Sequence, residues 1–255
     1  MLTPGLVSIT FRKLTIPEII HLVRKSELKS IEWGGDIHVP PGNAQAAEDA
    51  RKRTADAGLS VAAYGSYYRV GTSEKEQAPF EKVLQSAVAL QAPTIRVWAG
   101  SVGSAKVDAA ARKHLVRQTK RIASLAAEAK ITISFEFHRN TLTDTNEAAL
   151  QLLKEVDHSN VFSLWQPAVG ASLEYAAEGL RSLLPRLSNV HAFSWSDKGT
   201  DRLPLAAGRA RWSAFLDVAR SSGRDHHVLL EFVRDDSPER FLEDAATLRE
   251  WLADG

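Results

Sequence analysis

Short apolar runs alternate with longer segments of helical periodicity along the whole chain. The runs are rich in β-branched and aromatic residues and are four to seven residues long, which is typical of buried strands. Such alternation favours parallel strands that are joined by helices. We predict eight strands, at residues 5–10, 30–33, 59–65, 94–100, 131–137, 161–165, 190–195 and 227–233.

Capping signals mark the ends of several predicted helices. Thr15 and Glu18 have the capping-box spacing ahead of an amphipathic segment. Asn43 precedes an alanine-rich segment that stops at Gly58, and Ser237 precedes the final helical segment. These signals indicate that the segments between the strands are helices.

The number of strand and helix units predicts the architecture. Eight units in 255 residues give about 32 residues per unit, close to a (β/α)8 barrel of roughly 250 residues. An open doubly wound sheet is the main alternative, but no glycine-rich dinucleotide motif follows the first strand and no P-loop motif occurs. No linker-like tract interrupts the series. We therefore expect an α/β chain with one TIM-barrel domain over residues 1–255.

Composition and charge narrow the classes of function. The chain has 32 basic and 31 acidic residues, so its net charge of +1 provides no general attraction to nucleic acid or to anionic membranes. It has no cysteine, which excludes disulfides, thiolate metal ligands and a cysteine nucleophile. The first residues lack the pattern of a signal peptide, and no run of 18 apolar residues occurs. We expect a cytoplasmic protein with neither nucleic acid nor membrane as a partner.

Tryptophans gather where the predicted strands end. In a TIM barrel the active site lies at the carboxyl ends of the strands. Such rings can form the wall of a sugar-binding pocket, or they can fill the barrel mouth as part of the core. Trp33, Trp98, Trp165 and Trp195 occupy these positions.

Two carboxylates lie within the apolar ends of predicted strands. Glu136 occurs in SFEFH and Glu231 in LLEFV, where an unpaired charge would be costly to bury. A divalent metal would neutralise both, and His191 on the intervening strand and Gln166 at the end of strand 161–165 could complete the site. This donor set favours Mn²⁺ or Mg²⁺, with Zn²⁺ or Co²⁺ as alternatives. For one carboxylate the alternative is an ion pair with Arg96, Arg139 or Arg234.

Several stretches resemble the xylose isomerase-like TIM barrels of the sugar phosphate isomerase/epimerase superfamily. The resemblance runs from SITFRKL through IEWGGDIHVPPG, TIRVWAG, EFHRNTLTDT, WQP and HAFSW to LLEFVRDDSPE. It implies that a metal is bound by Glu136, His191, Glu231 and the residue at position 166. The family has an aspartate at that position, whereas this chain has Gln166. Epimerases of the family often have a histidine where this chain has Val169.

The resemblance also implies a function. We expect a metal-dependent isomerase or epimerase of a small sugar, polyol-derived ketone or sugar phosphate that acts through an enediolate, with Glu136 and Glu231 exchanging the proton. A dehydratase of a keto-sugar or inosose is the alternative, and a non-catalytic sugar-binding barrel is another. A homo-oligomer is compatible with the sequence. Substrate contacts are predicted for His38, Trp98, His138, Arg139, Trp165, Trp195, Lys198 and Arg234.

Overall fold

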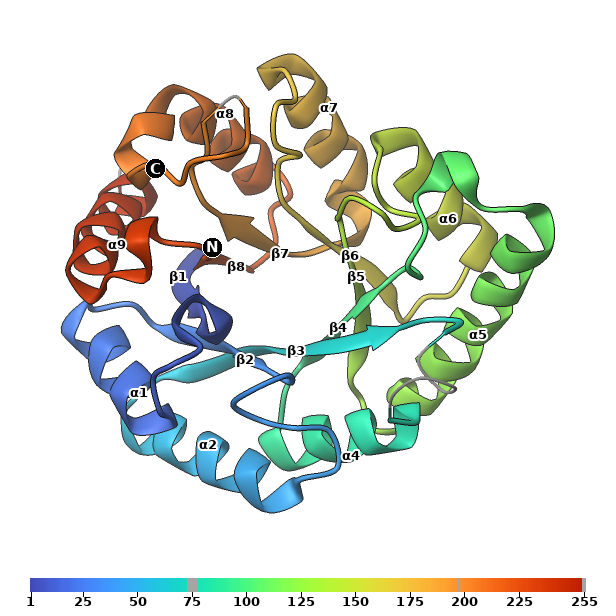
Figure 1. Ribbon diagram of the computed structural model, residues 1–255, viewed down its shortest axis with the longest axis horizontal. Helices are drawn as coiled ribbons and strands as arrows, with labels where there is room; N and C mark the ends of the chain where they lie inside the picture. The colour runs from blue at the N-terminus through green and yellow to red at the C-terminus, as the bar shows by residue number, and fades with distance from the viewer. Residues whose placement is uncertain (73–77, 197, 254–255) are drawn as a thin grey trace.

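Eight parallel strands close into a barrel in which each strand pairs with its neighbours in chain order and β1 pairs with β8 (Figure 1). The computed structural model describes residues 1–72, 78–196 and 198–253. It confirms the predicted (β/α)8 barrel. The strands are β1 (Leu2–Val7), β2 (Ser30–Gly34), β3 (Ser60–Arg69), β4 (Thr94–Trp98), β5 (Thr132–Glu136), β6 (Val161–Trp165), β7 (Leu187–Ala192) and β8 (His226–Leu230).

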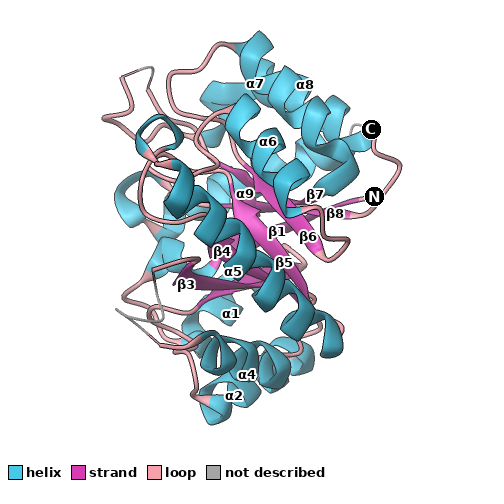
Figure 2. Cartoon of the chain, turned by 90° about the vertical axis from the view of Figure 1, so that its right-hand side faces the viewer, coloured by secondary structure: helices cyan, strands magenta, loops and turns pink. Residues whose placement is uncertain are grey.

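Helices surround the strands on the outside (Figures 1 and 2). They are α1 (Ile16–Lys25), α2 (Ala44–Asp56), α4 (Phe80–Leu90), α5 (Ala109–Glu128), α6 (Asn146–Val156), α7 (Leu173–Leu183), α8 (Arg209–Arg220) and α9 (Pro238–Ala253). Short 3₁₀ turns are η1 (Ser8–Phe11), η2 (Ser104–Lys106), η3 (Leu184–Arg186), η4 (Leu205–Gly208) and η5 (Arg234–Asp236).

The predicted caps are confirmed. Glu18 accepts the backbone N–H of Thr15 at 2.7 Å and completes a capping box. The side chain of Asn43 accepts the N–H of Ala46 at 3.0 Å. Gly58 follows α2 with a φ of +71°, a left-handed conformation that suits glycine. Ser237 accepts the N–H of Arg240 at 3.3 Å in the first turn of α9. Local sequence therefore sets these helix ends.

Four strands have an end that lies three or four residues from its predicted position. β1 ends at Val7 rather than at residue 10, because the backbone turns into η1 at Ser8, whose hydroxyl accepts the Gly34 N–H at 2.8 Å. β3 continues to Arg69, which pairs with Trp98 of β4. β7 spans 187–192 rather than 190–195, since its pairing with β6 starts at Leu187. β8 ends at Leu230, so Glu231 follows the strand. Pairing with neighbouring strands, not apolar composition, fixes these ends.

The apolar strand residues and the inner faces of the helices form a continuous core around the barrel. Against this apolar background, several charged or titratable side chains on the strands or directly after them are at most 3% exposed, among them Glu32, Arg96, Glu136, His191 and Glu231. Burial of such groups is costly unless they are paired, so they mark the candidate site.

No helix within the described residues combines the length and hydropathy that a membrane span requires.

Candidate functional site

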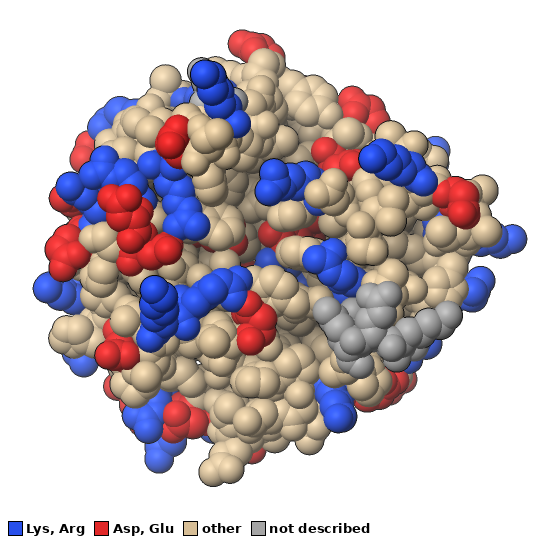
Figure 3. Space-filling model, viewed as in Figure 1, with Lys and Arg blue, Asp and Glu red and all other residues tan. Residues whose placement is uncertain are grey.

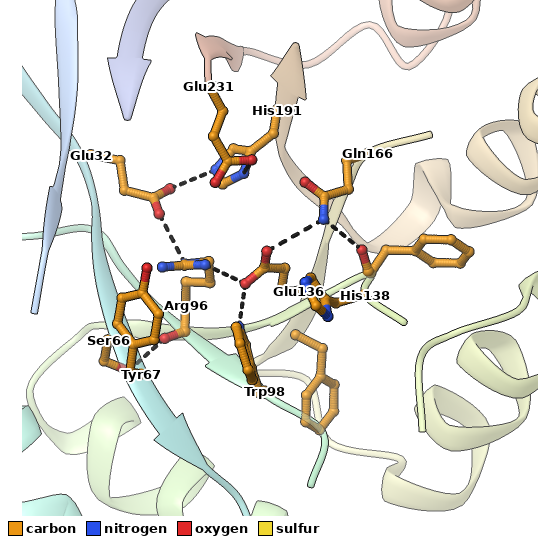
Figure 4. Close-up of polar contacts among 12 residues, drawn as sticks. Glu32, Ser66, Tyr67, Arg96, Trp98, Glu136, His138, Gln166, His191 and Glu231 are labelled. Carbon is orange, nitrogen blue, oxygen red and sulfur yellow. Dashed lines mark hydrogen bonds and ion pairs between the residues drawn. The ribbon is translucent and has the colours of Figure 1, made fainter. Parts of the chain in front are cut away.

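The buried charged side chains converge in the interior of the barrel (Figure 4). Side chains two residues apart on a strand point to the same side. Arg96 and Trp98 on β4 therefore share a side, and the register that sets Arg96 opposite Ser134 brings both next to Glu136 on β5. Figure 3 shows a hollow near the centre of the face viewed, with acidic and basic atoms at its floor.

Arg96 bridges two of the carboxylates. Its Nε lies 2.9 Å from Oε1 of Glu32, an ion pair without the geometry of a hydrogen bond. Its guanidinium also donates to Oε2 of Glu136, and the indole N–H of Trp98 donates to the same oxygen. The ion pair between Glu136 and Arg96, which the sequence left open as an alternative to a metal, is therefore present.

His191 bridges Glu32 and the third carboxylate, Glu231. Its Nε2 lies 3.0 Å from Oε2 of Glu32, and its Nδ1 lies 3.3 Å from Oε2 of Glu231. Burial disfavours the charged imidazolium, but the two carboxylates outweigh this and raise the pKa of His191 to about 10. Burial alone would raise the pKa of Glu32, but the positive charges of His191 and Arg96 hold it below its usual value. A metal ion would have to displace the proton from His191.

The predicted ligands fit a divalent metal. One ligand atom from each of Glu136, His191 and Glu231 lies within 4.8 Å of the others. Gln166 joins them, because its Nε2 donates to Oε1 of Glu136 at 3.3 Å and to the Phe137 carbonyl at 2.9 Å.

Three atoms of this group are buried without a hydrogen-bond partner among the described residues: Gln166 Oε1, His191 Nδ1 and Glu231 Oε2. Figure 4 shows Gln166 Oε1 on the side of His191 and Glu231. Unpartnered polar atoms that face one another could hold an ion, and a carboxylate, amide and imidazole set suits Mn²⁺ or Mg²⁺.

An aromatic and basic rim adjoins Glu136. The His138 ring stacks on Trp98 with centroids 4.7 Å apart and an interplanar angle of 17°. The guanidinium of Arg69 lies 3.8 Å from the Trp98 ring centroid. Because Trp98 also donates to Glu136, it connects this rim to the buried cluster. The predicted positions of Trp98 and His138 thus come together beside Glu136.

Four other residues that were predicted to contact substrate are exposed or half-buried. Arg139 and Lys198 are exposed on loops. Arg234 is half-buried, with its Nε 3.4 Å from Asp235. Trp195 is half-buried, and its ring centroid lies 6.0 Å from that of Phe232. Substrate contacts for these four residues stay predictions.

Two of the residues that were predicted to contact substrate are buried. Trp165 is 1% exposed and packs edge-to-face on Phe215 of α8, so it offers no surface to a ligand in this structure. His38 is 7% exposed, and both ring nitrogens have partners: Nδ1 lies 2.9 Å from the Ser8 hydroxyl and Nε2 lies 3.1 Å from the Leu14 carbonyl. Burial lowers the pKa of His38. It holds the loop after β2 against η1.

Glu32 and Arg69 lie at the site but were not among the predicted site residues. Glu32 stands in the buried strand SIEWG, the same kind of context that identified Glu136 and Glu231, so the signal was present. Arg69 falls beyond the predicted end of β3, and only the observed pairing with Trp98 places it at the rim.

The chain is similar to known proteins over most of its length. The family model described as "Xylose isomerase-like TIM barrel" matches residues 20–251. A 3-dehydroshikimate dehydratase from Bacillus anthracis is 29% identical over 260 residues, which cover 89% of this chain and 90% of the relative.

Solved structures share the fold. The probable 3-DHS dehydratase AsbF from Bacillus anthracis has a TM-score of 0.80 at 21% identity, covering 98% of this chain and 99% of that one. D-psicose 3-epimerase from Clostridium cellulolyticum H10 has a TM-score of 0.75 at 13% identity, covering 98% of each chain.

Proposed function

The chain belongs to the xylose isomerase-like TIM barrel family, and from this premise we propose that it is a divalent-metal-dependent lyase that dehydrates a cyclic keto acid of the 3-dehydroshikimate type. The convergence of Glu136, His191 and Glu231, with unpartnered ligand atoms facing one another, carries the proposal. The similarity to a 3-dehydroshikimate dehydratase extends over nearly all of both chains and supports dehydration.

An isomerase or epimerase of a small sugar is the second candidate. Two carboxylates close together, Glu136 and Glu231, could remove a proton beside a carbonyl and return it at another face. The resemblance to D-psicose 3-epimerase supports the shared fold, since the identity is 13%. The dehydratase is the better supported of the two.

Dehydration needs a base, an acid and stabilisation of an enolate. A C–H bond next to the carbonyl breaks and its electrons form the enolate; the β C–O bond then breaks as a C=C bond forms, and the hydroxyl leaves as water. A divalent ion held by Glu136, Gln166, His191 and Glu231 would supply Lewis acidity at the carbonyl oxygen. In this scheme Glu231 or Glu136 takes the proton from carbon. Arg96 and Trp98 hold Glu136 in place, because both donate to its Oε2.

His138 is suited to protonate the leaving hydroxyl. Its Nδ1 lies 2.7 Å from the carbonyl oxygen of Arg139, which can only accept, so Nδ1 carries a proton. Nε2 is then the nitrogen that can exchange a proton with a substrate oxygen. Stacking on Trp98 fixes the orientation of the ring.

A substrate of this class carries a carboxylate, which calls for a cation near the reacting carbons. Arg69 lies over the Trp98 ring, and Trp98 donates to Glu136, so the guanidinium is one indole ring away from the buried cluster. We assign Arg69 to the substrate carboxylate. Arginine matches a carboxylate through two parallel N–H groups.

The proposed function predicts loss of water from 3-dehydroshikimate. Protein supplied with Mn²⁺ or Mg²⁺ should give a dihydroxybenzoate product whose mass is one water lower and which absorbs in the near ultraviolet. Mass spectrometry of a panel that also contains ketoses, inososes and sugar phosphates is the measurement. A product of unchanged mass from a sugar would support the isomerase instead, and binding without turnover would support a sugar-binding barrel.

Gln166→Asp is expected to strengthen Mn²⁺ binding by about 10-fold to 100-fold. The change adds a carboxylate in place of a neutral amide and removes the amide donor to Glu136. Calorimetric titration of chelator-treated protein measures the effect. Gln151→Asp, on the exposed face of α6, is the control and should leave the affinity unchanged. Equal affinity of Gln166→Asp and the parent protein would remove residue 166 from the ligand set.

A further inference from the structure

We propose that Glu32 is a positioning residue that determines which nitrogen of His191 carries the proton, and so leaves the nitrogen that faces the metal centre free to bind an ion. The inference rests on the metal centre of the proposed function, but not on the reaction that this centre catalyses. It assigns a role to a residue that is not among the metal ligands, and Figure 4 shows Glu32 on the far side of His191 from Gln166.

Glu32 fixes the tautomer of His191. Glu32 is fully buried, and its Oε2 lies 3.0 Å from Nε2 of His191. An ionised carboxylate can only accept a hydrogen bond, so Nε2 must carry the proton. In the neutral ring, Nδ1 then has the lone pair, and Nδ1 is the nitrogen that lies beside Glu231. A carboxylate that orients a metal-binding imidazole in this way typically changes metal affinity by about 10-fold to 100-fold when it is removed.

Glu231 can compete for the same histidine. Its Oε2 lies 3.3 Å from Nδ1, so a ring that carried its proton on Nδ1 would donate to Glu231. In that tautomer the nitrogen that faces the ligand group has no lone pair and cannot bind an ion. Without Glu32, both tautomers have a reason to be populated. The carboxylate behind the ring therefore selects the binding-competent form.

The barrel holds Glu32 in this position from two sides. Arg96 pairs with its Oε1 at 2.9 Å. Gly65 on β3 leaves the space that the carboxylate fills, because a Cβ at position 65 would lie 2.6 Å from Oε1 of Glu32 and 3.0 Å from Nη2 of Arg96. The backbone of Gly65 does not need a left-handed conformation. The position is therefore one where a side chain would collide with the Glu32–Arg96 pair.

Two kinds of variant test the inference. Glu32→Ala removes the acceptor, and we expect Mn²⁺ to bind about 10-fold to 100-fold more weakly by calorimetry. Glu32→Gln keeps an oxygen that can accept from Nε2 and should recover part of the affinity. Gly65→Ala keeps every functional group but pushes the carboxylate aside, so it should also weaken binding if Glu32→Ala does not fold. Ser66→Ala is the matched buried control, since Ser66 bonds to the Arg96 carbonyl at 2.5 Å, and should bind as the parent does.

A second readout separates positioning from general damage to the fold. Long-range ¹H–¹⁵N spectra at a Mg²⁺ concentration that saturates the parent should show His191 protonated on Nε2 in the parent and in Ser66→Ala, and a changed or mixed tautomer in Glu32→Ala, whose metal site is only partly filled at that concentration. If Glu32→Ala and Gly65→Ala bound Mn²⁺ as tightly as the parent and kept its His191 tautomer, the inference would be wrong while the proposed metal centre would stand. Failure of the parent to bind Mn²⁺ would overturn the metal centre and the inference with it. If the protein bound metal but did not dehydrate 3-dehydroshikimate, only the proposed reaction would be wrong.

Discussion

Glu136→Gln is expected to lower kcat for the dehydration of 3-dehydroshikimate by about a thousand-fold or more. The substitution keeps the shape of the side chain but removes the negative charge that Arg96 and Trp98 now hold in place. It removes both a candidate base and a metal ligand. Exchange of solvent deuterium into the substrate should disappear as well, since exchange needs proton removal from carbon. Glu231→Gln should have a similar effect.

Controls distinguish loss of chemistry from loss of structure. Glu147→Gln changes an exposed glutamate at the start of α6 and should keep full turnover. The melting temperature and the circular dichroism spectrum of each variant report whether the barrel is intact. Full turnover by either Glu136→Gln or Glu231→Gln would take that residue out of the mechanism, whatever its distance from the other ligands.

The fold was predictable from the sequence because strand and helix patterns alternate at a nearly regular interval. The site was partly predictable for a related reason. Charged residues inside apolar strands are costly, and in a parallel barrel the strand ends meet at one face, so Glu136, His191 and Glu231 could be grouped before their distances were known. The structure brings these three together within 4.8 Å.

Other features depend on register and packing, which local patterns do not encode. Trp165 follows the same sequence rule as Trp98, yet one ring packs against α8 and the other reaches the site. Arg69 becomes a rim residue because β3 continues four residues past its predicted end at residue 65. The cytoplasmic location and the absence of a nucleic-acid partner stay predictions, as does the compatibility of the chain with a homo-oligomer.

The buried charges connect the site to the stability of the barrel. Three carboxylates, of Glu32, Glu136 and Glu231, face one guanidinium and one imidazole. Binding of a divalent ion with release of the His191 proton would bring the positive and negative charges of this cluster into balance. In the metal-free protein the positive charges of this cluster are those of Arg96 and protonated His191, and the carboxylates of Glu32 and Glu231 raise the pKa of His191 to about 10.

Arg96→Met is therefore expected to destabilise the metal-free protein by about 3–5 kcal/mol. Methionine fills a similar volume but leaves Glu32 and Glu136 without their common cation, and uncompensated buried charges are costly. Urea unfolding in the presence of a chelator measures the loss. Mn²⁺ should restore part of the stability, because an ion bound to the folded state neutralises Glu136 and favours that state.

A surface ion pair offers the comparison. Arg181 binds Glu178 at 2.6 Å with 57% of its side chain exposed, so Arg181→Met should cost no more than about 1 kcal/mol. If Arg96→Met were as stable as Arg181→Met without metal, the carboxylates of Glu32 and Glu136 would have to be neutral in the folded protein. In that case Arg96 would not balance the buried charge, and Mn²⁺ would stabilise the parent and the Arg96 variant equally.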